Sequence, residues 1–131
     1  MKHVINAILL LVGLINFFPV VGVLSAERLA NLYGVGLDSP DLVILMRHRA
    51  VLLGLLGACI VTSVFKPALR PWACGGGLIS MLSFVLLAYA NGAYGDALNT
   101  VVIADIIASI GLAIVVALNF AAPRAATDST S

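Results

Sequence analysis

Five polar side chains lie within stretches of the chain that are otherwise apolar: Asn16, Arg47, His48, Arg49 and Asp105. An arginine and a carboxylate in such surroundings form an ion pair or a small polar site, and imidazole is the side chain that most readily exchanges a proton near neutral pH. One carboxylate and one histidine beside two cations are a poor ligand set, so we expect no metal site. The sequence shows neither paired carboxylates nor an activated nucleophile, which favours a protein without catalysis, and we expect no cofactor.

The composition places these residues in a membrane protein. The chain is 62% hydrophobic and 10% charged, whereas about 25% of the residues of a soluble domain are charged. Four apolar stretches can each cross about 30 Å of hydrocarbon, at about residues 4–24, 41–65, 72–90 and 97–120. We therefore predict an all-α polytopic membrane protein: one domain over residues 1–120 that forms a four-transmembrane-helix bundle, and a disordered tail over residues 121–131.

The first span begins like a signal peptide, because Lys2 precedes an apolar run that ends near Ala26. The run is longer than the roughly 7–15 residues of a signal sequence, and cleavage after Ala26 would place Leu24 where a small residue is required. These features favour an uncleaved span. Pro19 cannot donate a hydrogen bond to the carbonyl of Ile15, which predicts a kink near the end of the span.

Two signals describe the connection between the first and second spans. A polar helix start at Ser25 is followed by Leu29, Leu32 and Tyr33 at helical spacing, which predicts a short interfacial amphipathic helix. The alternative is a plain loop. Ser39 then supplies an N-cap for the second span, with a proline at the first helical position.

Lysine and arginine residues in the short flanks predict the orientation of the chain. The side of both termini carries Lys2, Lys66, Arg70 and Arg124. The opposite side carries Arg28 alone when the embedded arginines are left out, so the positive-inside rule favours both termini inside. The net charge of +1 offers no basic patch, so nucleic acid is not an expected partner.

This topology predicts that the polar side chains share one layer of the outer leaflet. Arg47 and Asp105 lie about 10–14 Å along their helices from the outer end, at about 1.5 Å per residue, and Asn16 lies at a similar level. Ser83 is an additional candidate because it lies close to the same layer. Glu27 is another, because an outward-facing arginine would reach it from the second span.

Arg47 is the predicted partner of Asp105. It shares a helical face with Ala50, Gly54 and Gly57, and small residues mark the packed side of a membrane helix. The carboxylate has no long stem, so it requires a partner, a wet cavity or a proton.

Arg49 lies on a bulkier face of the same helix, so we expect it to reach outward, toward lipid head groups or Glu27. His48 falls between the two arginines. The sequence leaves open two interpretations of the cluster: an Arg/Asp pair that only fixes helix register, or a polar site for a ligand, a proton or an anionic head group.

Several motifs resemble a known family. They lie at residues 16–25, 27–29, 32–35, 45–57 and 102–106. They are similar to segments of small bacterial inner-membrane proteins of four helices that are loosely DoxX-like, and the resemblance covers nearly the whole chain except the tail. Members often carry the name phosphopantetheine adenylyltransferase, a soluble nucleotidyltransferase with a His-x-Gly-His motif. This chain lacks that motif, because its only histidines, His3 and His48, stand far apart.

We therefore expect a multi-pass protein of the bacterial inner membrane with both termini in the cytoplasm. The favoured function is an accessory or partner-binding subunit whose Arg/Asp layer is structural. The alternative is a small-ligand-binding or proton-coupled transport protein that uses Asp105, Arg47 and His48. The expected partners are membrane lipid and another membrane protein or a second copy of the chain.

Overall fold

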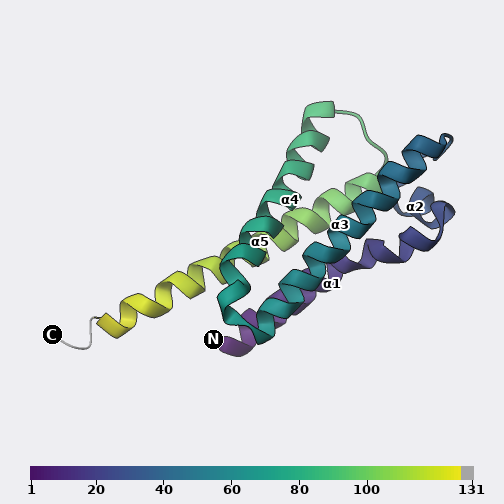
Figure 1. Cartoon of the computed structure of the whole chain (residues 1–131). Helices are drawn as coiled ribbons and strands as arrows, with labels where there is room; N and C mark the ends of the chain where they lie inside the picture. The colour runs from purple at the N-terminus through teal and green to yellow at the C-terminus, as the bar shows by residue number, and fades with distance from the viewer. Residues whose placement is uncertain (128–131) are drawn as a thin grey trace.

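A computed structural model describes the backbone of residues 1–127 and the side chains of residues 1–119, and this part of the chain is helical with short connections (Figure 1). The elements are α1 (Lys2–Phe17), the 3₁₀ segment η1 (Phe18–Leu24), α2 (Ala26–Tyr33), α3 (Pro40–Phe65), the 3₁₀ turn η2 (Pro67–Leu69), α4 (Arg70–Asn91) and α5 (Asp96–Thr127). Four helical stretches are long and apolar enough to cross a membrane: Lys2–Leu24, Pro40–Phe65, Pro67–Asn91 and Asp96–Asn119. The predicted all-α, four-helix membrane architecture is confirmed.

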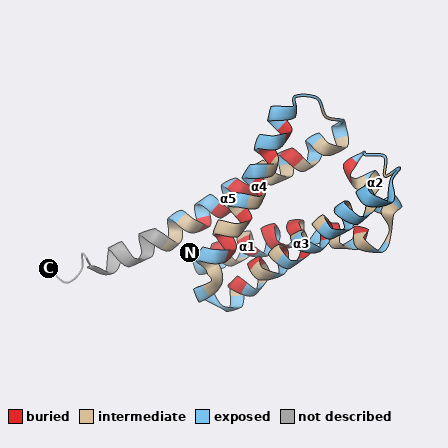
Figure 2. Cartoon of the chain, turned by 45° about the horizontal axis from the view of Figure 1, so that its top comes forward, coloured by how far each residue is buried: buried red, intermediate tan, exposed pale blue. Residues whose placement is uncertain are grey.

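The four long helices pack in a closed order. Helix α1 packs against α3 and α5, and α4 packs against the same two helices, so α1 and α4 lie diagonally across the bundle. Fully buried side chains from all four helices form the core between them, among them Leu9, Ile60, Met81 and Leu112. The outward faces of the helices are exposed, as Figure 2 shows. Many of the exposed residues are large and apolar, and such a surface suits contact with lipid.

Helices α1 and α3 approach each other so closely at Gly13 and Gly57 that a residue with a Cβ atom would not fit there. A Cβ atom added to Gly57 would lie 2.6 Å from the carbonyl oxygen of Gly13 and 2.7 Å from the backbone nitrogen of Phe17. The two backbones are therefore in direct contact, as small residues permit in membrane helices. The small face of α3 that includes Gly57 is thus occupied by α1.

The kink predicted at Pro19 takes the form of a change in helix type. Helix α1 ends at Phe17, and the chain continues as the 3₁₀ segment η1 to Leu24. Ser25 then caps α2, its Oγ accepting a hydrogen bond from the backbone N–H of Arg28 at 3.4 Å. The short helix predicted between the first two spans is therefore present, and it ends at Gly34 in the left-handed conformation with φ of 63°.

Helix α2 closes one end of the bundle. Its side chains Leu29 and Tyr33 are buried together with Ala50 of α3, and Leu98 of α5 packs against them. Helix α3 begins as the sequence predicts, because the Ser39 Oγ accepts a hydrogen bond from the N–H of Leu42 at 3.2 Å. This packing brings the end of α2 beside the first third of α3.

The opposite end of the bundle is held by Arg70. Its Nη2 donates to the side-chain oxygen of Asn6 at 3.0 Å, and its Nε donates to the carbonyl oxygen of Ser63 at 3.2 Å. These bonds join α1, α3 and the start of α4. At the carboxyl end, α5 extends to Thr127 and so enters residues 121–131, for which the sequence predicts a disordered tail. Residues 128–131 of that predicted tail lie outside the described residues.

Candidate ligand pocket

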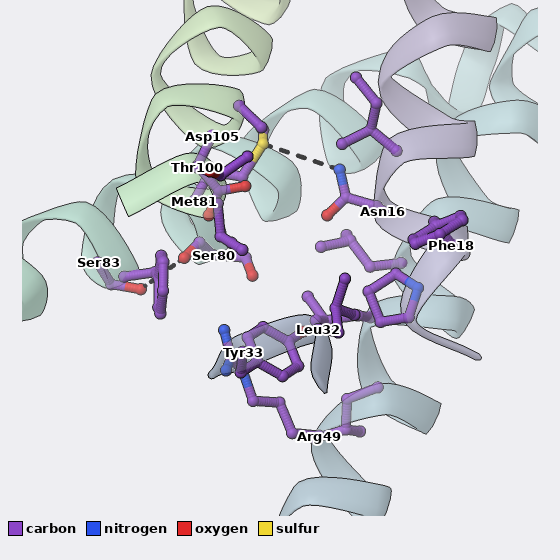
Figure 3. A pocket seen from close by; sticks show the side chains of 18 of the residues that line it. Asn16, Phe18, Leu32, Tyr33, Arg49, Ser80, Met81, Ser83, Thr100 and Asp105 are labelled. Atoms are coloured by element: carbon purple, nitrogen blue, oxygen red, sulfur yellow. Dashed lines mark hydrogen bonds between the residues drawn. The ribbon is translucent and has the colours of Figure 1, made fainter. Parts of the chain in front are cut away.

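A pocket of about 580 Å³ lies in the half of the bundle that carries α2 (Figure 3). Side chains from α1, η1, α2, α3, α4 and α5 line it, so it forms only when the whole chain is folded. Its volume falls within the range of roughly 300–1,000 Å³ that small-molecule sites occupy. Its polar lining residues are Asn16, Tyr33, Arg49, Ser80, Ser83, Thr100 and Asp105.

Arg49 is held between two aromatic rings at the edge of this pocket. Its guanidinium carbon lies 4.8 Å from the centroid of the Tyr33 ring and 4.7 Å from that of Phe84. Both distances allow a cation–π interaction, which contributes up to about 2 kcal/mol where water is excluded. One side chain of α3 thereby connects α2 with α4.

Asp105 supplies a carboxylate to the same pocket from α5, and its side chain is partly buried. Arg49 of α3 lines the pocket together with this carboxylate. The predicted partner, Arg47, is instead exposed and is not among the pocket residues. The assignment of the two arginines is therefore reversed relative to the sequence prediction.

The reversal has a steric cause. The small face of α3, with Ala50, Gly54 and Gly57, packs against α2, η1 and α1 and leaves no space there for a cavity. The bulkier face, with Leu53 and Leu56, lines the pocket together with Arg49. On α3, the small residues therefore lie where neighbouring backbones are in contact, and the larger residues line the pocket.

Asn16 contributes a buried amide to the pocket. Only 4% of its surface is exposed, and its Nδ2 donates to the carbonyl oxygen of Val12 at 3.0 Å and to the Met81 sulfur at 3.8 Å. Within the part of the chain that the structure describes, no hydrogen bond reaches its Oδ1. Figure 3 shows this oxygen pointing toward the interior of the pocket, where it can accept a hydrogen bond from a ligand.

Tyr33 borders the pocket from the last turn of α2 and is 4% exposed. Burial raises the pKa of its phenol above the ordinary value; the Arg49 cation lowers it and the Asp105 carboxylate raises it further. The phenol is therefore neutral at physiological pH and retains a hydroxyl proton that it can donate.

The remaining candidates from the sequence are divided between the pocket and the surface. Ser83 lines the pocket, and its Oγ donates to the carbonyl oxygen of Ser80 at 2.9 Å. His48 and Glu27 are exposed and are not pocket residues. Over the described residues, no group of three or more His, Cys, Asp or Glu side chains could hold a metal ion.

Sequence reasoning did not identify Tyr33, Phe84 or Thr100 as site residues. Tyr33 was recognisable only as part of the apolar side of a short helix, because its contact with Arg49 depends on how α2 packs on α3. Phe84 and Thr100 lie in stretches whose composition gives no sign of a site.

Comparisons of this chain with protein-family models, with curated proteins and with solved structures found no match.

Proposed function

We propose that this chain is a multi-pass protein of the bacterial inner membrane that binds a small ligand in the pocket between Asn16, Tyr33, Arg49 and Asp105. The observation that carries the proposal is the convergence of a buried amide, a cation and a carboxylate, each from a different helix, on one space of about 580 Å³. Ionisable groups inside a membrane are costly and tend to serve a function. The proposed function is binding, without catalysis.

The proposed orientation has both termini in the cytoplasm, because Lys2, Lys66 and Arg70 lie at the end of the bundle that is opposite to α2. The pocket then lies in the outer leaflet. The proposed family is that of the small, loosely DoxX-like four-helix proteins, which the sequence motifs resemble.

A second candidate is an accessory subunit in which the same residues only stabilise the fold. The position of Arg49 between Tyr33 and Phe84 supports it, since this contact would hold three helices together without any ligand. The two candidates predict different effects of Asp105→Asn. A binding site would lose its ligand and keep its fold, whereas a structural residue would be needed for folding.

Native mass spectrometry of gently extracted protein tests the proposal. The wild type and Asp96→Asn, a control at an exposed carboxylate at the start of α5, should retain the same bound small molecule. Asp105→Asn should lose it while its thermal unfolding stays cooperative. A wild type without bound mass, together with an Asp105→Asn protein that no longer folds, would instead support the structural role.

A further inference from the structure

Residues of α3 and α4 that line the pocket are also exposed on the outer surface of the bundle. Of these residues, Leu52 on α3 is 52% exposed and Leu87 on α4 is 68% exposed. Figures 1 and 2 both show α4 leaning away from α3 toward the loop that joins α4 to α5. Because both helices belong to apolar spans, a molecule that enters the pocket between them would come from the bilayer without crossing water.

The lining is mostly apolar and carries a few polar side chains. Leu52, Leu53 and Leu56 border the pocket on α3, whereas Asn16 and Asp105 border it on α1 and α5. Such a distribution suits a molecule with an alkyl chain and a polar head. The chain would lie between α3 and α4, and the head would reach the amide and the carboxylate.

The charges of the pocket limit the kind of head group. Arg49 and Asp105 contribute one positive and one negative charge, and these are the charged residues that line it. A head group with a single charge would be attracted by one of them and repelled by the other, and it would leave the pocket with an uncompensated net charge away from water, which is costly. A head group without net charge can donate to Asp105 and the Asn16 Oδ1 and accept from Arg49 or Tyr33.

We propose that the ligand is an amphiphile from the bilayer with an alkyl chain and a head group of zero net charge that both donates and accepts hydrogen bonds. Its head lies among Asn16, Tyr33, Arg49 and Asp105, and its chain leaves the pocket between α3 and α4. This inference rests on the proposed ligand-binding function.

Photocrosslinking of the full chain in mild detergent tests it. The probes are a long-chain alcohol, the corresponding fatty acid and the corresponding alkylammonium ion, each with a diazirine on the same alkyl chain. Peptide mass spectrometry locates the label. We expect the alcohol to label α3 around Leu52 and Leu56 and α4 around Leu87, and excess unlabelled alcohol to abolish this labelling. The charged probes should bind about tenfold more weakly.

Two variants should change the head-group preference in opposite directions. Arg49→Gln leaves a net negative pocket and should favour the alkylammonium ion, and Asp105→Asn leaves a net positive pocket and should favour the fatty acid. Arg47→Gln removes an exposed arginine outside the pocket and should leave the preference unchanged. If one of the charge variants does not fold, the other still decides the question.

Labelling that excess alcohol does not displace, or an unchanged preference in a folded charge variant, would each overturn the inference. A bound molecule without an alkyl chain on the wild type would overturn it while leaving the ligand-binding function intact. A wild type with neither bound mass nor displaceable labelling would overturn both.

Discussion

The guanidinium carbon of Arg49 lies 4.8 Å from the centre of the Tyr33 ring, so the last turn of α2 is attached to α3 by a cation–π contact at the edge of the pocket. Phe84 of α4 completes the contact from the other side at 4.7 Å. Three helices thus meet on one charged side chain, which both orders the bundle and presents a cation to the pocket.

Replacement of the Arg49 side chain should lower the stability of the fold. We expect Arg49→Gln to lower the free energy of unfolding by about 1–2 kcal/mol, because two partly buried cation–π contacts are lost. Arg47→Gln, at an exposed position two residues earlier, should change it by less than about 0.5 kcal/mol. Denaturant titrations in mild detergent measure both values. Equal effects of the two substitutions would show that the aromatic contacts contribute nothing.

The contact between the backbones of α1 and α3 predicts a strong effect of one methyl group. Gly57→Ala would place a Cβ atom 2.6 Å from the Gly13 oxygen, and such overpacking costs about 1–3 kcal/mol. Gly75→Ala on α4 would meet nothing within 4 Å and should be neutral or stabilising by up to about 1 kcal/mol from helix propensity. The same unfolding titrations compare them. A Gly57→Ala protein as stable as Gly75→Ala would contradict this close approach.

Two buried serines should respond in opposite ways to the loss of their hydroxyl groups. The Ser109 Oγ is buried and has no partner within the described part of the chain, so Ser109→Ala should be neutral or stabilising by about 1 kcal/mol. Ser63 donates to the carbonyl oxygen of Ile60 at 2.6 Å, and Ser63→Ala should cost about 1 kcal/mol. Thermal unfolding midpoints of the two variants check the difference. A larger loss at Ser109 than at Ser63 would mean that its hydroxyl has a partner.

The raised pKa of the Tyr33 phenol should make the protein less stable at alkaline pH. Below its ordinary pKa of 10.0 the phenol is protonated in both folded and unfolded chains. As the pH rises above that value, the Tyr33 phenol ionises in the unfolded chain, whereas its raised pKa keeps it protonated in the folded chain. Ionisation therefore stabilises the unfolded chain, and the free energy of unfolding falls. Tyr33→Phe should therefore lose less stability over this range than the wild type, and Tyr89→Phe, at an exposed position, should follow the wild type. Unfolding titrations across the alkaline range measure this, and parallel curves for the two variants would count against it.

The sequence predicted the architecture because each of its main features is local. Four apolar stretches, the Ser39 N-cap and the effect of Pro19 depend on neighbouring residues, and the structure has helices, a cap and a change of helix type there. The choice between Arg47 and Arg49 depended on which face of α3 meets which neighbour. Small residues indicated a packed face correctly, but that face is filled by α1, so the pocket lies beside the bulkier side chains.

The pocket itself could not be predicted for a related reason. Its lining combines side chains from six elements, and the position of Tyr33 depends on the packing of α2 against α3 and α5. Asn16 and Asp105 were identifiable as polar residues in apolar helices, and both line the pocket. Helix rise alone predicted that Asn16 and Asp105 lie at the same level along the bundle. It could not predict that Tyr33 and Phe84 lie beside them.

The central claim is that the space between these helices holds a ligand, and a variant that fills the space without changing its charge tests it most directly. Ala104 lines the pocket, and Ala113 is exposed on the same helix. We predict that native mass spectrometry finds the bound molecule on the wild type and on Ala113→Leu and finds at least about tenfold less on a folded Ala104→Leu protein. Equal retention by the two variants, or no bound molecule on the wild type, would contradict the claim.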